Sequence, residues 1–548
     1  MHLRILHIDL KHQHYRFEHY LGLLDLAAGW GYNAVLMEYE DMFPYPGHAA
    51  LRHRDSWRTR EVRQFLDRAR RLNVEVIPLV QTFGHLGFAL RHESYFPLCE
   101  DPAEQDGLVE SICPSNPQAV ALVEHFVQAT IDAHPDSRYI HLGGDEALMG
   151  VCPRCRRRVA RIGRGRHYAE HMNRLIDRVL RAGRRPVIWA DCLEHHPAGL
   201  DVLRKETILC DWGYESVALR QPWVFVRAGD SSAAVLRGVP RRLRRQGQPW
   251  YWAARGCWSP YVTRRNLSGL PAALRRAMRP CWSHGIPDYP AHFHGFPYLR
   301  YLHDKGFDVM YAAAMLSGGA DNRYAVDLDL HLRNCAAAAQ AVAQVGGLGV
   351  VTTSWAASGF TPWEGRYLGL ALAAQAYRTN GQLDPERAAA DYERRTFGRK
   401  VGLLAAQREL LACSFVPAIV FKGDHFEPVA LAGTAAPGGP SPDVLARFDR
   451  LERLIRWADG VGMRHREIGV LRYAAEELLY QYGLGLAHQE WRVSRRMLTR
   501  PALRDDLGRI RRRHAAMFRR PLTPWYFRMD RTLRFAAGEQ WLAGGGTR

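Results

Sequence analysis

Two adjacent carboxylates, Asp145 and Glu146, close the segment HLGGDE at residues 141–146. Neighbouring acids repel each other, and burial raises the pKa of at least one of them. A glycosidase needs such a group, because a carboxylic acid with a raised pKa can protonate the leaving glycosidic oxygen. We therefore predict that Asp145 and Glu146 are catalytic, with Glu146 as the acid. The alternative is an acidic pair that only caps the following helix.

The spacing of this pair restricts the backbone. In a regular strand, residues 145 and 146 would project to opposite faces. Both side chains can serve one site only if the strand ends there. Gly143 and Gly144 supply the necessary backbone freedom. We therefore expect a strand that stops close to this segment.

Eight short apolar runs alternate with amphipathic helical segments along the first 375 residues. Most of the runs are nearly continuous in Val, Ile and Leu, which is typical of strands buried on both faces. Residues 62–72 and 119–134 show the three-and-four spacing of amphipathic helices. The pattern predicts an α/β fold, a (β/α)8 TIM barrel. The predicted strands are residues 4–10, 34–40, 75–81, 139–146, 186–191, 207–214, 308–314 and 349–355.

Polar and aromatic residues gather where these runs end. In a (β/α)8 barrel, the carboxyl ends of the strands form the face that carries the active site. One or two such residues could be structural, but a purely structural barrel has no need of so many at one rim. The rim residues are Asp9, Glu38, Glu40, Gln81, His85, Asp145, Glu146, Trp189, Asp191, Asp211, Trp212, Tyr311 and Trp355.

At this point the sequence resembles glycoside hydrolase family 20, the β-N-acetylhexosaminidases. HLGGDE matches the His-x-Gly-Gly-Asp-Glu signature of the fourth strand in that family. The likeness is closer to the hexosaminidase D type and covers roughly residues 3–375. It continues in LMEYEDMFPY at 36–45, IPLVQTFGH at 77–85, VIWADC at 187–192 and HLRN at 331–334.

The resemblance implies a retaining exo-β-N-acetylhexosaminidase that acts on terminal GlcNAc or GalNAc by substrate-assisted hydrolysis. In that mechanism the 2-acetamido oxygen of the substrate attacks the anomeric carbon and forms an oxazolinium intermediate, an exception to the two-carboxylate scheme. Asp145 would hold the acetamide N–H. Glu146 would protonate the leaving oxygen and then accept a proton from water.

Further substrate-binding residues follow from the same resemblance and from the rim. Trp189 and Trp355 would line the sugar subsite, and Tyr311 would bond the acetamide oxygen. The remaining candidates are His85, Asp191, Glu364, Asp9 and Glu38. One departure concerns sugar recognition: many family members place an arginine after the first strand, where this chain has Lys11. A lysine cannot form the bidentate fork of arginine.

Two segments lie outside the regular alternation. Residues 215–300 form an insertion rich in Arg, Trp, Pro and His, which is either an active-site lid or a small subdomain. After about residue 380 the strand signal stops, and residues 445–458, 467–488 and 503–518 read as amphipathic helices. We therefore expect a catalytic barrel at 1–375 and an α-helical domain at 376–548. Its helices are plain scaffold or contribute to a homodimer.

The formal charge of +19 comes almost entirely from arginine, because lysine occurs only at 11, 205, 305, 400 and 422. The arginines are scattered through every segment, which favours a compositional bias over a nucleic-acid or membrane footprint. The N-terminus has no signal-peptide pattern and no run of apolar residues is long enough for a membrane span. Ten cysteines without framework spacing fit the cytoplasm.

A single CxxC occurs, Cys152-Pro153-Arg154-Cys155. A zinc site needs further ligands, and no other pair of Cys or His has a matching spacing. We therefore expect a local turn with free thiols, and no metal or cofactor. A metal or redox role is the weaker alternative.

Three other functions compete with the main interpretation. One is a barrel glycosidase of another specificity, such as a disaccharide-releasing enzyme, whose subsite the insertion could shape. Another is a non-catalytic glycan-binding barrel, against which the intact Asp145 and Glu146 argue. The third is a nucleic-acid-binding protein, motivated only by charge, which would bind with a steep salt dependence.

Overall fold

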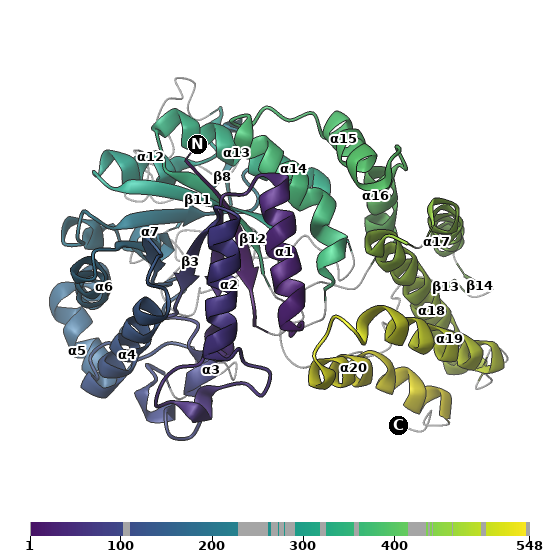
Figure 1. Cartoon of the computed structure of the whole chain (residues 1–548), viewed down its shortest axis with the longest axis horizontal. Helices are drawn as coiled ribbons and strands as arrows, with labels where there is room; N and C mark the ends of the chain where they lie inside the picture. The colour runs from purple at the N-terminus through teal and green to yellow at the C-terminus, as the bar shows by residue number, and fades with distance from the viewer. Residues whose placement is uncertain are drawn as a thin grey trace.

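We describe the fold from a computed structural model of the chain. The structure describes residues 2–11, 13–101, 110–227, 261–264, 272, 279, 291–317, 325–355, 361–414, 435–436, 439–440, 442–462, 464–494 and 500–543. Its centre is a closed barrel of parallel strands, seen in Figure 1 with helices around it. The barrel strands, in their order around the barrel, are β1 (Leu3–Asp9), β12 (Gly349–Ser354), β11 (Asp308–Leu316), β6 (Ile208–Trp212), β5 (Arg185–Trp189), β4 (Tyr139–His141), β3 (Glu75–Leu79) and β2 (Ala34–Glu38).

Alternation along each strand divides the core into two layers. Leu3 and Ile5 of β1 belong to the cluster inside the barrel, whereas Leu6 and Ile8 belong to the layer between barrel and helices. Successive side chains of a strand point to opposite faces, so a run apolar at every position can supply both layers. This explains why the strands read as continuous apolar runs.

The helices between the strands cover the outside of the barrel. Their apolar faces bury residues such as Val62 and Phe65 against it. The covering helices are α1 (Phe17–Trp30), α2 (Thr59–Arg71), α4 (Pro117–Ala133), α5 (Pro153–Ile162), α6 (Arg164–Arg181), α12 (Pro297–Asp304), α13 (Leu328–Val345) and α14 (Tyr367–Arg378). Short helices in the loops are η1 (Glu40–Met42), η2 (Ala49–Leu51), α3 (Gly87–Leu90), η3 (Phe96–Leu98), α7 (Asp191–His195), η4 (Pro197–Asp201) and η7 (Trp363–Arg366).

The prediction of a (β/α)8 barrel is confirmed. Each predicted run overlaps a barrel strand, and the helices predicted at 62–72 and 119–134 correspond to α2 and α4. The largest difference is at the fourth run, where the strand ends at His141 although the run extends to Glu146. Two glycines with positive φ follow that end, so the backbone departs from the sheet there.

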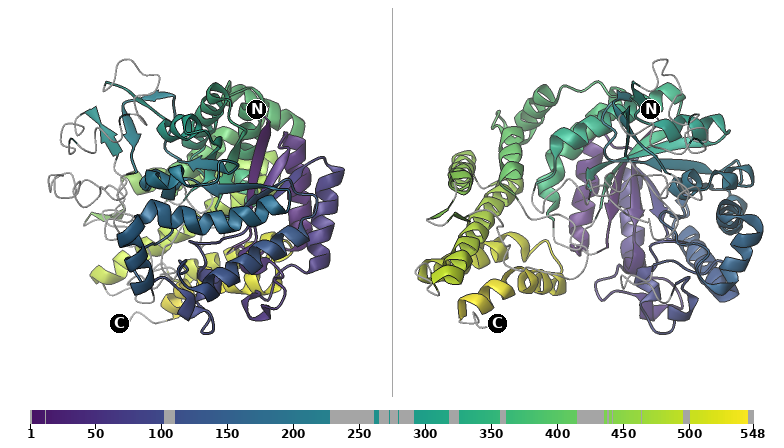
Figure 2. Two further views of the ribbon diagram at one scale, coloured as in Figure 1. Left: turned by 90° about the vertical axis from the view of Figure 1, so that its left-hand side faces the viewer. Right: turned by 180° about the vertical axis from the view of Figure 1, so that it is seen from behind.

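Helices also form the C-terminal part of the described chain (Figure 2). The three predicted there are present as α17 (Pro442–Val461), α18 (Arg466–Ser494) and α19 (Arg500–Phe518). Three more were not predicted: α15 (Pro385–Phe397), α16 (Leu403–Cys413) and α20 (Pro524–Ala543). The start of α15 carried a local signal, because Asp384 caps it and Pro385 follows at the first helical position. The domain division at residue 375 stays a prediction.

The segment between α19 and α20 contacts the loop that follows β1. The backbone N–H of Arg16 donates to the carbonyl of Pro521 at 2.8 Å, and that of Thr523 donates to the carbonyl of His14 at 2.9 Å. The Thr523 hydroxyl also donates to Asp55 at 2.6 Å. The loop after the first strand is therefore held by the C-terminal chain.

Most of the predicted insertion at 215–300, including its Trp-rich stretch, lies outside the described residues. The described parts pair as two small antiparallel ribbons, β7 (Arg220–Gln221) with β10 (Phe293–His294) and β8 (Trp223–Phe225) with β9 (Tyr261–Thr263). A further ribbon pairs β13 (Ala435–Ala436) with β14 (Gly439–Pro440). The choice between lid and subdomain stays open.

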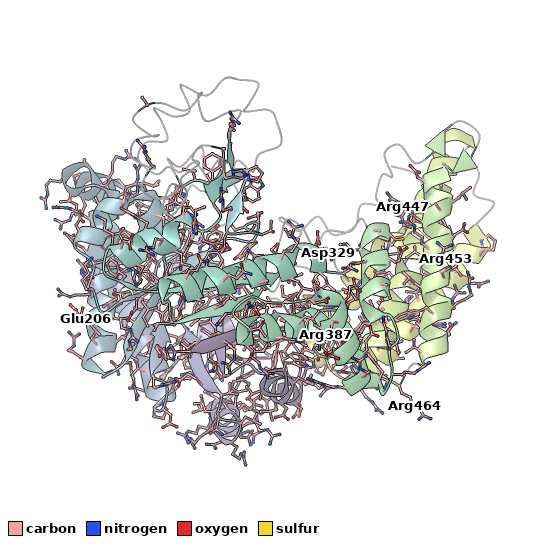
Figure 3. The ribbon with its side chains drawn as sticks, turned by 90° about the horizontal axis from the view of Figure 1, so that it is seen from above. Glu206, Asp329, Arg387, Arg447, Arg453 and Arg464 are labelled. Carbon is pink, nitrogen blue, oxygen red and sulfur yellow. The ribbon has the colours of Figure 1, made fainter. Side chains whose placement is uncertain are left out.

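None of the helices that the structure describes is both long and apolar enough to cross a bilayer. Arginines labelled in Figure 3 occupy separate places on the C-terminal helices: Arg387 on α15, Arg447 and Arg453 on α17, and Arg464 before α18.

A buried acid in the helical part gives a stability test. Glu467 of α18 accepts hydrogen bonds from Tyr392 Oη, which lies 2.9 Å from both carboxylate oxygens. Burial raises the pKa of Glu467 from 4.5 to about 8. The folded chain therefore keeps a proton that the unfolded chain releases between these values. This stabilising contribution is complete below pH 4.5 and is lost as the pH rises through about 8.

We expect Glu467→Gln to remove this pH dependence, because glutamine does not titrate. The stability advantage of the wild type over the variant should fall as the pH rises from 4.5 to 8, with a slope of up to about 1.4 kcal/mol per pH unit. Unfolding midpoints in denaturant, measured across that range for both proteins, check this. A difference that does not vary with pH contradicts it.

Candidate active site at the strand ends

The inward-facing side chains change character at the carboxyl end of the barrel. Below that level they are apolar, as Ile5, Leu36 and Leu79 are. Two residues further along each strand the alternation places polar groups: His7 after Ile5, Glu38 after Leu36, and Gln81 after Leu79. The rim predicted from sequence therefore has a polar floor that lies directly on an apolar barrel core.

The backbone after β4 turns sharply. Gly143 and Gly144 have φ of +62° and +89°, and a Cβ at Gly143 would lie 2.1 Å from Gln81 Oε1. A side chain is therefore excluded there by conformation and by space. Glu146 also has a left-handed φ of +47°, and its N–H donates to Asp191 Oδ2 at 2.9 Å. Asp191 thus holds the backbone of Glu146 in this conformation.

This turn brings the two neighbouring carboxylates to one partner. His85 Nε2 lies 3.3 Å from Asp145 Oδ2 and 3.3 Å from Glu146 Oε2. Its other nitrogen, Nδ1, lies 3.4 Å from Glu110 Oε2. The pair therefore faces a common side, as the glycines predicted, and the predicted site residue His85 lies between them.

Charge and exposure differ between the members of this cluster. Burial opposes the charged form of His85, but Asp145, Glu110 and Glu146 outweigh it and raise the pKa of His85 well above its usual value. The Glu146 side chain keeps 30% of its accessible surface, and that of Asp145 keeps 10%. Asp145 Oδ1 is buried without a hydrogen-bond partner among the described residues. An unpaired buried carboxylate oxygen is costly and therefore calls for a donor.

Aromatic rings surround the cluster. Trp189 lies inside the barrel end with its ring centroid 6.1 Å from that of Trp355, and its buried Nε1 has no partner in the described part of the chain. Trp355 Nε1 donates to Tyr214 Oη at 2.8 Å, and Tyr214 stacks on Trp212 at 5.6 Å. The predicted Trp189 and Trp355 are thus brought together at the rim.

Lys11 is enclosed by acids. Its Nζ lies 2.9 Å from Glu38, 3.4 Å from Glu40 and 3.6 Å from Asp9. Despite their burial, these charges raise the pKa of Lys11 and lower that of Glu38. Both oxygens of Glu38 have partners, because His7 lies 2.9 Å from Oε2. His7, Asp9 and Glu38 have the arrangement of a metal-ligand group, but the Lys11 ammonium already supplies the cation there.

Two predicted site residues lie elsewhere. Tyr311 points outward from β11 into the layer beneath the helices, and its hydroxyl donates to the carbonyl of Gly213 at 2.8 Å. Glu364 is buried against the C-terminal helices, where Arg466 donates to it at 2.7 Å. The structure brings neither residue to His85, because strand alternation turns the first away and the fold of the last loop removes the second.

Tyr214 is the rim residue that the sequence analysis did not select. The electrostatic influence of Glu146 and Asp145 reaches it, and burial raises the pKa of its phenol. A signal was present: Cys210 lies inside the barrel, and a period of two from it leads to Trp212 and Tyr214. The same period turns Asp211 outward, where it pairs with Arg227 at 3.5 Å.

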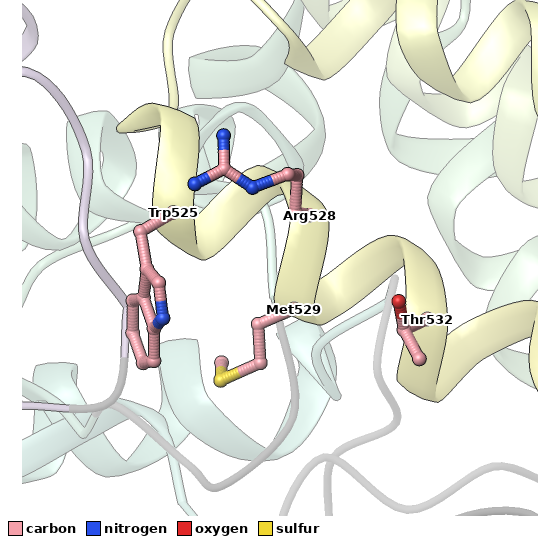
Figure 4. A pocket seen from close by; sticks show the side chains of 4 residues that line it. All are labelled: Trp525, Arg528, Met529 and Thr532. Carbon is pink, nitrogen blue, oxygen red and sulfur yellow. The ribbon is translucent and has the colours of Figure 1, made fainter.

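A separate hollow of about 270 Å³ lies on α20 and is lined by Trp525, Arg528, Met529 and Thr532 (Figure 4). All four side chains come from one helix, and none is an acid or a nucleophile. This hollow therefore lacks the groups for glycoside hydrolysis, and the strand-end cluster remains the candidate active site.

The chain is similar to known proteins over the segment that contains the strand-end cluster. Residues 38–223 match the model of glycosyl hydrolase family 20, catalytic domain. Hexosaminidase D of Bos taurus is 29% identical over 283 residues, which cover 50% of this chain and 78% of that protein. Hexosaminidase D of Homo sapiens is 30% identical over 258 residues, 46% of this chain. The chain spans half the length of that human relative.

Solved structures resemble the chain more distantly. A family 20 exo-β-N-acetylglucosaminidase from Vibrio harveyi, in complex with N-acetylglucosamine, is 14% identical with a TM-score of 0.43 and covers 70% of this chain and 55% of that one. The matched residues 38–223 include Asp145, Glu146 and His85. The resemblance that HLGGDE indicated is confirmed: the part of the chain that holds Asp145 and Glu146 is similar to the catalytic domain of glycosyl hydrolase family 20 and to hexosaminidase D.

Proposed function

We propose that the chain is a retaining exo-β-N-acetylhexosaminidase that uses the acetamide of its substrate as the nucleophile. The observation that carries the proposal is the pairing of two different carboxylates at one histidine. Asp145 is buried with an unpartnered oxygen, and its neighbour Glu146 is accessible. A terminal GlcNAc or GalNAc would supply the N–H that Asp145 lacks.

Asp145 would orient the acetamide. Its Oδ2 faces the positive His85, which leaves Oδ1 to accept the N–H of the sugar. A carboxylate there favours the charge that develops on the acetamide nitrogen as the carbonyl oxygen attacks the anomeric carbon. Holding the two reacting atoms in contact is a proximity effect worth several kcal/mol or more, on the order of 7–11 in favourable cases.

Glu146 would move the proton. In the first step it donates a proton to the glycosidic oxygen as the bond to the anomeric carbon breaks and the oxazolinium ring closes. In the second step the carboxylate takes a proton from water, which attacks the anomeric carbon and reopens the ring. The hydrogen bond from its backbone to Asp191 would keep this side chain in place through both steps.

The aromatic rim would bind the sugar and its acetamide. Trp189 and Trp355 offer apolar ring surfaces of the kind that pack against a sugar face. We assign the donor to the acetamide oxygen to Tyr214 in place of Tyr311, because Tyr214 lies on the same inward face as Trp212 and feels the charges of both acids. Its raised pKa keeps the phenol protonated, as a donor must be.

Recognition of the other hydroxyls would rest on Lys11. Asp9 and Glu38 were predicted to bind substrate directly, but their contacts favour a supporting role that fixes the lysine. A single ammonium group cannot make the bidentate hydrogen bonds that an arginine guanidinium makes to two hydroxyls. We therefore propose both GlcNAc and GalNAc as substrates. A disaccharide-releasing specificity, a homodimer and a cytoplasmic location remain predictions.

The acid pair gives the first activity test. With aryl β-GlcNAc and β-GalNAc substrates, we expect Glu146→Gln and Asp145→Asn each to lower kcat by about 10²–10⁴-fold, because each removes a group that acts only in the transition state. Steady-state kinetics measure this. Aryl β-glucoside, which lacks the acetamide, should not be cleaved. Comparable turnover of the glucoside contradicts the mechanism.

The leaving group separates the two roles. A dinitrophenyl leaving group departs without protonation, so kcat/KM of Glu146→Gln should fall far less on that substrate than on an alkyl glycoside. Asp145→Asn should lose kcat/KM on both substrates alike. Equal sensitivity of the two variants to the leaving group would remove the assignment of proton transfer to Glu146, and the opposite ranking would transfer that role to Asp145.

The tyrosines form a matched pair for the second activity test. Tyr214→Phe should lower kcat by about 10²-fold, the usual cost of losing a donor to a developing negative oxygen. Tyr311→Phe removes an equivalent hydroxyl that donates to the Gly213 carbonyl outside the rim. It should lower thermal stability and leave kcat close to that of the wild type. The reverse ranking of the two kcat values would restore Tyr311 as the acetamide ligand.

A further inference from the structure

Three cysteines and a glutamate meet beside the barrel, away from the sugar-binding groups. Cys113 Sγ lies 3.4 Å from Cys152 Sγ and 3.5 Å from Cys155 Sγ. A Glu100 oxygen completes a group whose four ligand atoms lie within 4.8 Å of one another. The sequence offers the CxxC no partner at a regular spacing, yet the fold brings two further ligands to it.

Two loops contribute these groups. Glu100 and Cys113 belong to the segment between β3 and α4, whereas Cys152 and Cys155 lie at the start of α5. Figure 1 shows α4, α5 and α6 together on one flank of the barrel. The loops are already joined by hydrogen bonds between backbone and side chain. Glu100 Oε1 accepts from the N–H of Val151 at 2.8 Å and from that of Cys152 at 3.3 Å.

The buried Glu100 carboxylate calls for a positively charged partner. The residue is completely buried, and its Oε2 has no hydrogen-bond partner among the residues that the structure describes. An isolated buried carboxylate is expensive, and such groups are paired or bind metals. The three thiols next to it are donors or soft ligands.

We propose that Glu100, Cys113, Cys152 and Cys155 bind one zinc ion as a closed structural site. Zinc prefers four tetrahedral ligands, with Zn–S distances near 2.3 Å. These place two sulfurs about 3.8 Å apart in a regular tetrahedron, close to the 3.4 and 3.5 Å observed. Four protein ligands leave no open position, so the ion would hold structure and not take part in catalysis.

One contact favours a thiolate at Cys152, against the burial that raises the pKa of this thiol. Cys152 is the N-cap of α5, and its sulfur accepts from the N–H of Cys155 at 3.3 Å. The positive end of the helix dipole stabilises a thiolate there. A disulfide from Cys113 to either partner is the competing arrangement. It would use two of the three sulfurs and leave Glu100 Oε2 buried without a partner among the described residues.

Such an ion would brace the catalytic turn. The loop from β3 carries His85 and Glu110, and the loop from β4 carries Asp145 and Glu146. The N–H of Leu148 donates to Ser111 Oγ at 2.9 Å between these loops. Cys113 lies two residues after Ser111, and Cys152 lies four residues after Leu148. Zinc would therefore fix the distance between the histidine and the two acids.

The test measures metal directly. The full chain, purified under reducing conditions without a tag and dialysed into metal-free buffer, should retain about one zinc per chain by elemental mass spectrometry. Titration with an organomercurial, which blocks thiolates, should release that zinc to a chromogenic indicator. Replacing it with Co(II) should give a tetrahedral spectrum with a sulfur-to-cobalt charge-transfer band.

Variants identify the ligands. Cys113→Ser and Cys152→Ser should each lose most of the zinc and lower the thermal midpoint. The control Cys335→Ser replaces a buried cysteine of α13 whose thiol donates to the Ala314 carbonyl, far from the four ligands in the sequence, and it should keep the zinc. If the ligand variants do not fold, the cobalt spectrum of the wild type decides. A zinc-free wild type, a Co(II) complex without sulfur bands, or full zinc in folded Cys113→Ser overturns the proposal.

Discussion

The site depends on one change of backbone direction after β4. A regular strand would send Asp145 and Glu146 to opposite sides of the barrel wall. The left-handed glycines and the left-handed Glu146 break that alternation, so both acids reach His85. Asp191 holds the turn from the next strand through the Glu146 N–H. If this turn relaxed into strand geometry, the two carboxylates could no longer act on one sugar ring.

Electrostatic balance at the rim follows from that turn. The chain carries a formal charge of +19, yet acids dominate the strand ends, and each group of them contains one cation. His85 is the cation beside Asp145, Glu146 and Glu110. Lys11 is the cation beside Asp9, Glu38 and Glu40. In the His85 group, this excess of acid leaves Asp145 Oδ1 available for a hydroxyl or amide donor of a ligand. The proposed zinc would balance a third acidic group in the same way, but sealed from the substrate.

Local signals in the sequence predicted what depends on local structure. The barrel follows from apolar runs and helical spacing, and the convergence of Asp145 and Glu146 on one side follows from two acids behind two glycines. Tyr214 could also have been predicted, because it continues the alternation of side chains that begins with Cys210 and Trp212. Tyr311 was chosen by family likeness, and the outward phase of β11 separates it from the rim. Glu364 lies away from the rim for a different reason: its partner Arg466 is 102 residues away, and no local pattern shows that contact. The association of Glu100 and Cys113 with the CxxC is likewise a product of the fold.

The central claim is that the acetamide oxygen of the substrate, oriented by Asp145, is the nucleophile. A series of aryl glycosides whose N-acetyl group carries zero to three fluorine atoms tests this most directly. Fluorine withdraws electrons from the carbonyl oxygen, so kcat/KM should fall steeply with each substitution while the aryl leaving group stays the same. A rate that does not respond to fluorination would show that the amide does not attack, and it would contradict the account.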